Sequence, residues 1–322
     1  MRRLFAGLTA GAFLLAGTAC GSSDGGSSDA SPSSGGTTTV KVGLIPIVDV
    51  APLYLGQKKG FYEKRGLKLE LTAAQGGAAI VPAVASGQYQ FGFSNVTSLM
   101  IAQSNSVPVK AVVNGIASTG VQGKDFNGLV VKKGSAITSP KELEGKKVAI
   151  NTLKNINESA VRESVRKAGG DPDKVNFVEL AFDQMPAALD KGQIDAASVV
   201  EPALATVKSQ GGVEIDSPLI DVAPDLTVAM YFTSAQYLQQ NPDVVKKFKE
   251  ATAESLAYAD SHPDEVREVV TTYTKIPASV LAQVTLPKWP AEANRASIEA
   301  LAKLGEQDGL FKKTPDLDAL LP

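Results

Sequence analysis

The sequence contains very few of the residues on which most metal and nucleophile chemistry depends. Among its 322 residues there are one Cys, one His and one Trp. A zinc site needs several Cys, His or carboxylate ligands, and thiol–His catalysis needs both partners in the folded part of the chain. His262 stands in DSHPDE, a helix-start pattern, and Cys20 lies close to the N-terminus. The composition therefore predicts no metal site, no cofactor and no catalytic residue.

An excess of charge of one sign is also missing. The chain has 32 Lys and Arg residues against 34 Asp and Glu residues, a net charge of -2. Because nucleic-acid binding requires a basic face, this balance predicts no nucleic-acid partner. With 43% hydrophobic and 20% charged residues, the chain suits a globular protein of one or two domains.

Long apolar runs are scarce, and the one near the N-terminus, residues 4–17, is too short to cross a bilayer as a stable helix. It follows the basic residues MRR and precedes small residues that end at Cys20. This arrangement resembles a bacterial lipoprotein signal, which implies a signal peptide over 1–19 and a lipid on Cys20. Gly17 stands where such signals usually have a branched apolar residue, and the alternative is an ordinary secretory signal with an incidental Cys.

The next stretch, residues 20–39, has no large apolar residue after Cys20 and consists mainly of Ser, Gly and Thr. It cannot bury a core, so we expect a flexible tether. A Gly/Ser coil of this length has an r.m.s. reach of roughly 25 Å. No later segment is apolar enough to cross a membrane, so the expected membrane contact is the lipid anchor only.

From Val40 onward, short apolar runs alternate with helical patterns. This alternation predicts βαβ units and a mainly parallel sheet. A Gly-rich stretch, residues 115–128, separates a first α/β series from a second, and the chain is mostly helical after Tyr237. The predicted strands are 40–47, 67–73, 89–94, 107–115, 129–133, 146–151, 174–180, 194–200 and 226–234.

Four stretches of this α/β region carry a family resemblance. They are APLYLGQKKGFYEKRGLKLEL from Ala51, GGAAIVPAVASGQYQFGFSNVTSL from Gly76, SAITSPKELEGKKVAINT from Ser135 and AALDKGQIDAASVVEPAL from Ala187. In this order they resemble the solute-binding proteins of the nitrate/sulfonate/taurine and thiamine-pyrimidine group, which are receptors of ABC importers. The resemblance covers roughly residues 40–234.

The resemblance implies an α/β protein with the type II periplasmic-binding-protein fold. Two α/β lobes would be joined by a hinge that the chain crosses twice, with a helical C-terminal tail on lobe one. Lobe one would hold 40–133 and 227–322, and lobe two would hold 134–226. Ligands of open α/β sheets bind beyond the carboxyl ends of the strands, so a cleft between the lobes is the expected site.

Residues at three predicted helix starts are candidate ligand contacts. A helix N-terminus presents unpaired N–H groups and the positive end of a dipole, and a glycine allows close backbone approach. The alternative for each Asn or Ser is simple helix capping, and for Asn157 capping is the favoured interpretation. The candidates are Gly77, Ser94, Asn95, Asn155 and Asn157.

Two carboxylates complete the candidate site. Asp49 follows the first strand, and Glu201 follows the strand 194–200, so we expect them to face each other from opposite lobes. Two carboxylates in one cleft repel unless something positive or protonated lies between them. This disfavours a purely anionic ligand and favours a zwitterion, an amine or an aminopyrimidine-like molecule. The alternatives are a helix cap for Asp49 and a hinge or surface ion pair for Glu201.

The resemblance predicts an extracytoplasmic receptor, not an enzyme. It would be a lipid-anchored monomer on the outer face of a bacterial cell membrane. It would capture a small polar organic solute (a zwitterion, an amine or a sulfonate-like molecule) by lobe closure and deliver it to ABC permease subunits.

Three alternatives to this receptor remain open. The protein could bind a thiamine-pyrimidine precursor, or it could scavenge a ligand without feeding a transporter. It could also be a pyrimidine-synthase-like enzyme, which the single His262 and the missing Cys-rich motif disfavour.

Overall fold

The computed structural model describes residues 36–322. The predicted signal peptide, the lipidated Cys20 and most of the predicted tether lie outside these residues. The predicted end of the tether at residue 39 is wrong, because the first strand already begins at Thr38. Thr38 and Thr39 pair with Leu67 and Lys68 of the neighbouring strand. Backbone pairing to a neighbouring strand orders this polar end, although it buries little apolar surface.

The first sheet has the strand order β2-β1-β3-β10-β4. Strand β1 runs parallel to β2 and β3, whereas β10 runs antiparallel to β3 and β4. We call this sheet and its helices lobe one. Its strands are β1 (Thr38–Leu44), β2 (Leu67–Ala73), β3 (Phe91–Asn95), β4 (Val109–Ala117) and β10 (Thr227–Ser234).

The second sheet has the order β7-β6-β8-β5-β9, and we call it and its helices lobe two. Strand β6 is parallel to β7 and β8, and β5 is antiparallel to β8 and β9. The predicted α/β architecture of two lobes is confirmed. The strands are β5 (Asn127–Val131), β6 (Lys147–Ile150), β7 (Asn176–Glu179), β8 (Ala196–Val200) and β9 (Val213–Asp216).

The predicted boundary of lobe one at residue 133 is wrong. Strand β5 is fully buried and pairs with two strands of lobe two, so the chain first crosses between the lobes over residues 118–126. It crosses back between α7 and β10. An apolar run predicts a strand but not its partners, which is why β5 was assigned to the wrong sheet. Strand β9 was not predicted, because its half-exposed sequence VEID gives a weak strand pattern.

Helices surround both sheets. Lobe one carries α1 (Ala51–Lys58), α2 (Gly77–Ala85) and α3 (Val96–Ser104), and lobe two carries α4 (Ile156–Lys167), α5 (Met185–Asp190), α6 (Ala203–Ser209) and α7 (Pro218–Val222). The C-terminal part has α8 (Ala235–Gln240), α9 (Pro242–Ser261), α10 (Pro263–Val270), α11 (Ala278–Leu281), α12 (Arg295–Gln307) and α13 (Leu317–Leu320). Short 3-10 turns are η1 (Val48–Val50), η2 (Glu63–Arg65), η3 (Pro140–Leu143), η4 (Pro172–Lys174) and η5 (Phe182–Gln184).

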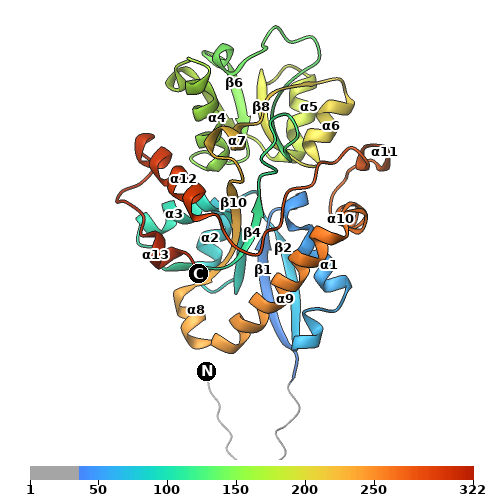
Figure 1. Ribbon diagram of the computed structural model, residues 1–322, viewed down its shortest axis with the longest axis vertical. Coiled ribbons are helices and arrows are strands. Elements are labelled where there is room, and N and C mark those ends of the chain that lie inside the picture. Colours follow the sequence, from blue (N-terminus) through green and yellow to red (C-terminus); the bar gives the residue numbers. More distant parts are fainter. Residues whose placement is uncertain (1–35) are drawn as a thin grey trace, which may run out of the picture. The chain divides into compact units, whose positions relative to one another are not determined.

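The C-terminal helices pack on lobe one and reach lobe two. Helix α9 begins with Pro242 in its first turn and lies alongside α1 (Figure 1). Its buried Phe248 stacks on Phe91 of β3 with ring centroids 3.8 Å apart, which ties the helix to the sheet. Helix α12 contacts α3 of lobe one and α4 of lobe two. Within residues 36–322, no helix combines the length and the apolarity that crossing a membrane requires.

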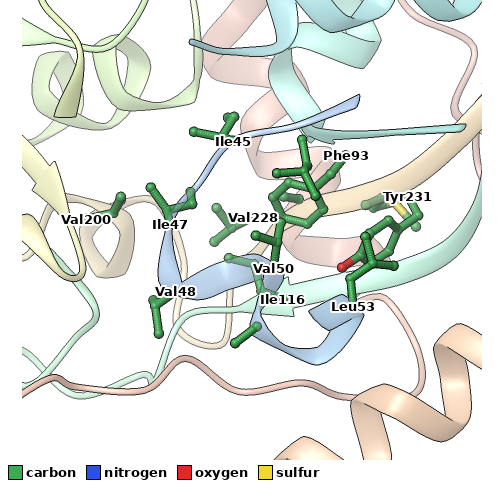
Figure 2. Packing of buried hydrophobic residues seen from close by; sticks show 14 of the residues in the cluster. Ile45, Ile47, Val48, Val50, Leu53, Phe93, Ile116, Val200, Val228 and Tyr231 are labelled. Carbon is green, nitrogen blue, oxygen red and sulfur yellow. The ribbon is translucent and has the colours of Figure 1, made fainter. Parts of the chain in front are cut away.

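The core of lobe one continues up to the start of the first helix. Figure 2 shows apolar side chains of the segment after β1 packed with side chains of β3, β4 and β10. Ile45, Ile47 and Val50 of this segment are each less than 10% exposed. The segment is therefore a rigid edge of the core, and it carries Asp49.

Candidate functional site

A cavity lies between the two lobes at the carboxyl ends of their strands. Its volume, measured as the space open to the centre of a water molecule, is about 30 Å³, which is room for about one or two waters. A larger ligand therefore requires the walls to move apart. Lobe one contributes Ile45, Ile47, Asp49, Phe93, Asn95, Val228 and Ala229, and lobe two contributes Asn151, Ile156, Asn157, Phe182, Val200 and Leu219.

The sequence after β1 explains why Asp49 reaches this cavity. β1 ends at Leu44, a short turn leads into η1, and α1 follows directly with a proline in its first turn. Asp49 sits in η1 with only 3% of its surface exposed. The residue that caps α1 is Val50, which has no side-chain acceptor, so the alternative that Asp49 caps the helix is wrong.

Two long-range hydrogen bonds fix the backbone around Asp49. The Trp289 Nε1–H group donates to the Asp49 main-chain oxygen at 3.4 Å, and the Tyr273 hydroxyl donates to the Ile47 main-chain oxygen at 3.0 Å. Both donors come from the C-terminal part of the chain, beyond the region that resembles the family. They use main-chain oxygens, which leaves the Asp49 carboxyl group free of them.

The Asp49 carboxyl group is buried without a full set of partners. Its Oδ1 atom makes no hydrogen bond with any residue of the described part of the chain. Burial raises the pKa of Asp49 to about 8, a backbone hydrogen bond at Asp49 lowers it, and the nearby charge of Asp125 raises it further. At neutral pH this group is therefore mostly protonated and can donate as well as accept a hydrogen bond.

Glu201 is equally buried but is held differently. It directly follows β8 and is 1% exposed. Its Oε2 atom accepts a hydrogen bond from the Ala205 N–H group and its Oε1 atom accepts one from the Thr285 N–H group, both at 2.9 Å. Burial raises the pKa of Glu201 to about 7, although these two main-chain donors lower it.

The two predicted carboxylates differ in their relation to the cavity. Asp49 lines the cavity, whereas the lining residues within 36–322 do not include Glu201. The segments that carry Asp49 and Glu201 touch through main-chain atoms: the Val48 N–H group donates to the main-chain oxygen of Glu201 at 3.1 Å. The Glu201 carboxylate ties the start of α6 to the C-terminal chain, and each of its two oxygens already accepts a main-chain N–H group.

The three candidates around β3 separate into one lining residue and two packing residues. Asn95 lines the cavity and also caps α3, because its side chain accepts from the Ser98 N–H group at 2.9 Å. Ser94 is fully buried and donates to the Asn95 main-chain oxygen at 3.3 Å. A Cβ atom on Gly77 would lie 2.3 Å from Ser94 Oγ, so this glycine permits close packing inside lobe one.

The asparagines of lobe two form a buried network. Asn155 caps α4 by accepting from the N–H groups of Asn157 and Glu158 at 3.0 and 3.2 Å. The expected cap at Asn157 is therefore wrong by two residues, since the helix starts at Ile156. Asn157 lies inside the first turn, and its side chain lines the cavity.

Asn151 is the centre of this network, and the sequence interpretation missed it. Its Oδ1 atom accepts from Asn155 at 2.6 Å and from Asn157 at 2.9 Å. Asn151 directly follows β6, so the rule that places ligand contacts after strand ends could have found it.

Asn151 also joins the two lobes. The Gln75 side chain donates to the Asn151 main-chain oxygen at 2.8 Å, and the Asn151 side chain donates to the Gln75 main-chain oxygen at 3.3 Å. This reciprocal pair links the loop before α2 to the loop after β6 at the edge of the cavity.

The lining residues suit binding better than catalysis. The four polar side chains are Asp49 and three asparagines, and the remaining nine residues are apolar. Among these lining residues of the described chain there is no Lys, Arg, His, Cys, Ser or Thr. Residues 36–322 also contain no cluster of three or more His, Cys, Asp or Glu that could hold a metal ion. A nucleophile and its base are thus not assembled in the cavity.

Comparison with known proteins gives consistent matches. A family model described as "NMT1/THI5 like" matches residues 47–266. A taurine-binding periplasmic protein of Escherichia coli is 28% identical over 204 residues, which cover 63% of this chain and 61% of that protein, less than two thirds of its length. A putative aliphatic sulfonates-binding protein of Bacillus subtilis is 23% identical, with 86% of this chain and 80% of that protein covered.

Two further matches bear on the chemistry and the fold. A 4-amino-5-hydroxymethyl-2-methylpyrimidine phosphate synthase of Aspergillus parasiticus is 25% identical, covering 66% of this chain and 64% of that protein. The crystal structure of an alkanesulfonate-binding protein from Xanthomonas axonopodis superimposes with a TM-score of 0.74 at 15% identity, covering 90% of this chain and 99% of the other. This likeness confirms the predicted fold.

Proposed function

The chain belongs to the NMT1/THI5-like family, and from this premise we propose that it is the solute-binding receptor of an ABC importer. It captures a small polar organic solute between its two lobes and delivers it to permease subunits. It works on the extracytoplasmic side of the membrane, held there as a monomer by the lipid on Cys20.

One observation carries this proposal. The cavity is built from both lobes, and its polar side chains stand at the carboxyl ends of β1, β3 and β6 or in the first turn of α4. Within residues 36–322 the chain crosses between the two sheets twice, so a relative movement of the lobes opens or closes the cavity. The small volume in this structure means that solute entry depends on such a movement.

The named relatives support the class of solute without fixing it. One relative is named for taurine and another for aliphatic sulfonates. Both kinds of compound are small and polar and carry an apolar body, which fits a cavity with four polar and nine apolar lining residues. A thiamine-pyrimidine precursor is a second candidate solute, because one matched relative is named as a 4-amino-5-hydroxymethyl-2-methylpyrimidine phosphate synthase.

An enzymatic function has weaker support. His262 stands between α9 and α10, where its ring stacks on Tyr258 with centroids 3.8 Å apart and its Nδ1 atom contacts the Tyr258 oxygen at 2.8 Å. The contacts of this histidine are with the end of α9, and it is not one of the described residues that line the cavity. The protein therefore offers the cavity neither a histidine nor a lysine for synthase-like chemistry.

A ligand screen with a structural readout tests the receptor function. Taurine, alkanesulfonates, nitrate, small amines and aminopyrimidines are added to the purified full-length protein, and its thermal unfolding is followed. We expect at least one compound to raise Tm and to lower the radius of gyration measured by X-ray scattering. Asn157→Ala should remove this response, and the exposed Asn176→Ala should keep it. The proposal fails if no compound changes Tm and native mass spectrometry of the isolated protein finds no bound molecule.

A further inference from the structure

The buried carboxyl group in the cavity wall has an oxygen that the folded chain does not satisfy. Asp49 is 3% exposed, lines the cavity, and its Oδ1 atom makes no hydrogen bond within residues 36–322. A buried polar atom without a partner lowers the stability of the folded state, and does so more strongly when it is charged. Because the backbone around it is fixed by Trp289 and Tyr273, the side chain cannot easily turn away to water.

The surroundings of Asp49 supply no positive charge. The titratable groups around it are Asp125 in the first crossing segment, Tyr231 of β10 and Tyr273 after α10. All of them are acids. Asp125 is itself fully buried, and its Oδ1 atom accepts from the Thr119 and Phe126 N–H groups. The described lining residues also include no basic side chain. A carboxylate at Asp49 therefore lacks a neighbouring counter-charge from residues 36–322.

Resting on the proposed receptor function, we propose that the natural solute carries a protonated nitrogen and that Asp49 binds this nitrogen. The solute is thus a small organic cation or zwitterion. Asn95, Asn151 and Asn157 bind its polar remainder, since amides can donate and accept. A simple anion such as nitrate or an alkanesulfonate leaves Asp49 without a donor and, once Asp49 ionises, is repelled by it.

Proton release is a consequence of this arrangement. In the free protein burial keeps the pKa of Asp49 near 8, so below that pH the group carries a proton. Binding of an ammonium group requires the carboxylate, and the proton leaves to solvent. Affinity should therefore rise about tenfold per pH unit up to about pH 8 and then level off, as long as the solute nitrogen stays protonated.

Matched probe pairs test the inference by calorimetry on the full-length protein. Taurine is compared with 2-hydroxyethanesulfonate and ethanolamine with ethylene glycol, so each pair exchanges an amine for a hydroxyl group. Nitrate and methanesulfonate serve as simple anions, and 4-aminopyrimidine serves as an aromatic base. Any compound carried over in the purified protein joins the series. We expect binding only by the amines and the aromatic base, not by nitrate, methanesulfonate or the hydroxyl compounds. For the amines we expect release of close to one proton at pH 7, read from titrations in two buffers of different ionisation enthalpy.

Variants give the second arm of the test. Asp49→Asn should weaken binding roughly 100-fold, because a charge-assisted hydrogen bond is lost, and it should abolish the proton release. Glu201→Gln is the matched control, since Glu201 is equally buried but lies outside the cavity lining. It should change neither the solute affinity nor the proton release. If a variant does not fold, the proton release measured on the unaltered protein still tests the inference.

The outcomes separate the two proposals. Tight binding of nitrate or methanesulfonate with no binding of amines overturns the inference and leaves the receptor function intact. Amine binding that Asp49→Asn does not weaken, or that releases no proton, also overturns the inference. If no probe binds and no carried-over molecule is found, the receptor function itself fails.

Discussion

The ends of strands β1 and β8 present two acids in equivalent places, one in each lobe. Asp49 and Glu201 are both at most 3% exposed, and burial raises the pKa of both. The Glu201 oxygens each accept a main-chain N–H group, whereas Oδ1 of Asp49 has no partner within the described residues. The position after a strand is therefore not what makes an acid available to a ligand. What decides is whether the main chain already satisfies the carboxyl group.

The pH dependence of stability should show the largest difference between these two acids. The pKa of Asp49 is raised from its ordinary value of 3.8 to about 8, so the folded state keeps a proton that the unfolded state loses. The difference between the folded and unfolded pKa of Asp49 therefore lowers the free energy of unfolding as pH rises, by about 1.4 kcal/mol per pH unit between roughly pH 5 and 7. This decrease in stability ends near pH 8.

Urea unfolding at pH 5, 6, 7 and 8 measures how the free energy of unfolding declines with pH. Asp49→Asn should flatten the decline over the whole range, about 3 kcal/mol between pH 5 and 7. Glu201→Gln should flatten it only below about pH 7, where the Glu201 titration ends. Curves for Asp49→Asn that run parallel to those of the unaltered protein would contradict the role of burial at Asp49.

A third buried acid sharpens the comparison, because it is paired with charge. The Asp308 side chain is 2% exposed and makes ion pairs with Arg162 and Arg166 of α4. Since Asp308 follows α12, which also contacts α3, these ion pairs connect the C-terminal helix to lobe two.

Asp308→Asn should lower the free energy of unfolding by about 3 kcal/mol, because the largely buried guanidinium groups of Arg162 and Arg166 lose their shared buried carboxylate and keep only Asp173 and Glu163. Asp264→Asn is the matched control, since Asp264 is fully exposed and pairs only with Arg267 along the same helix. It should change stability by less than about 0.5 kcal/mol in the same urea titration. Equal effects of the two substitutions would refute the buried ion pair.

Glu201→Gln should have an intermediate effect at pH 8. A glutamine has only one accepting oxygen, so one of the N–H groups of Ala205 and Thr285 faces an NH₂ group. We expect a loss of about 2 kcal/mol of stability, with unchanged affinity for any solute that binds. Glu299→Gln on α12 is the control, because Glu299 is half-exposed and pairs with Arg295 at the surface. A loss of solute affinity in Glu201→Gln would place this residue in the binding site after all.

The smallest effect should come from a residue that combines capping with cavity lining. Asn95→Ala removes the cap of α3 and should cost about 1 kcal/mol of stability in the absence of solute, as measured by thermal or urea unfolding. Asn176→Ala, at an exposed position of β7, should cost less than about 0.5 kcal/mol. An equal cost at both positions would show that the Asn95 cap does not stabilise α3.

Much of the fold follows from local sequence patterns. Alternating apolar runs and helix starts predict the two α/β series, and prolines and asparagines mark helix starts at Pro242 and Asn95. These features depend on neighbours along the chain, so the sequence shows them directly. The same patterns place Asp49 and Asn157 after strand ends or at helix starts, which makes both candidates, and both line the cavity.

Contacts between distant segments decided the rest. Strand β5 belongs to lobe two because its partners are β8 and β9. The Glu201 carboxylate accepts the N–H group of Thr285, 84 residues away, and Glu201 lies outside the cavity lining of the described residues. Asn151 is held at the cavity by hydrogen bonds to Gln75, Asn155 and Asn157. The sequence by itself determined which residues are polar and where the elements run. Only the tertiary structure decided which buried polar atoms find partners in the chain and which remain for a ligand, because those partners are far away in sequence.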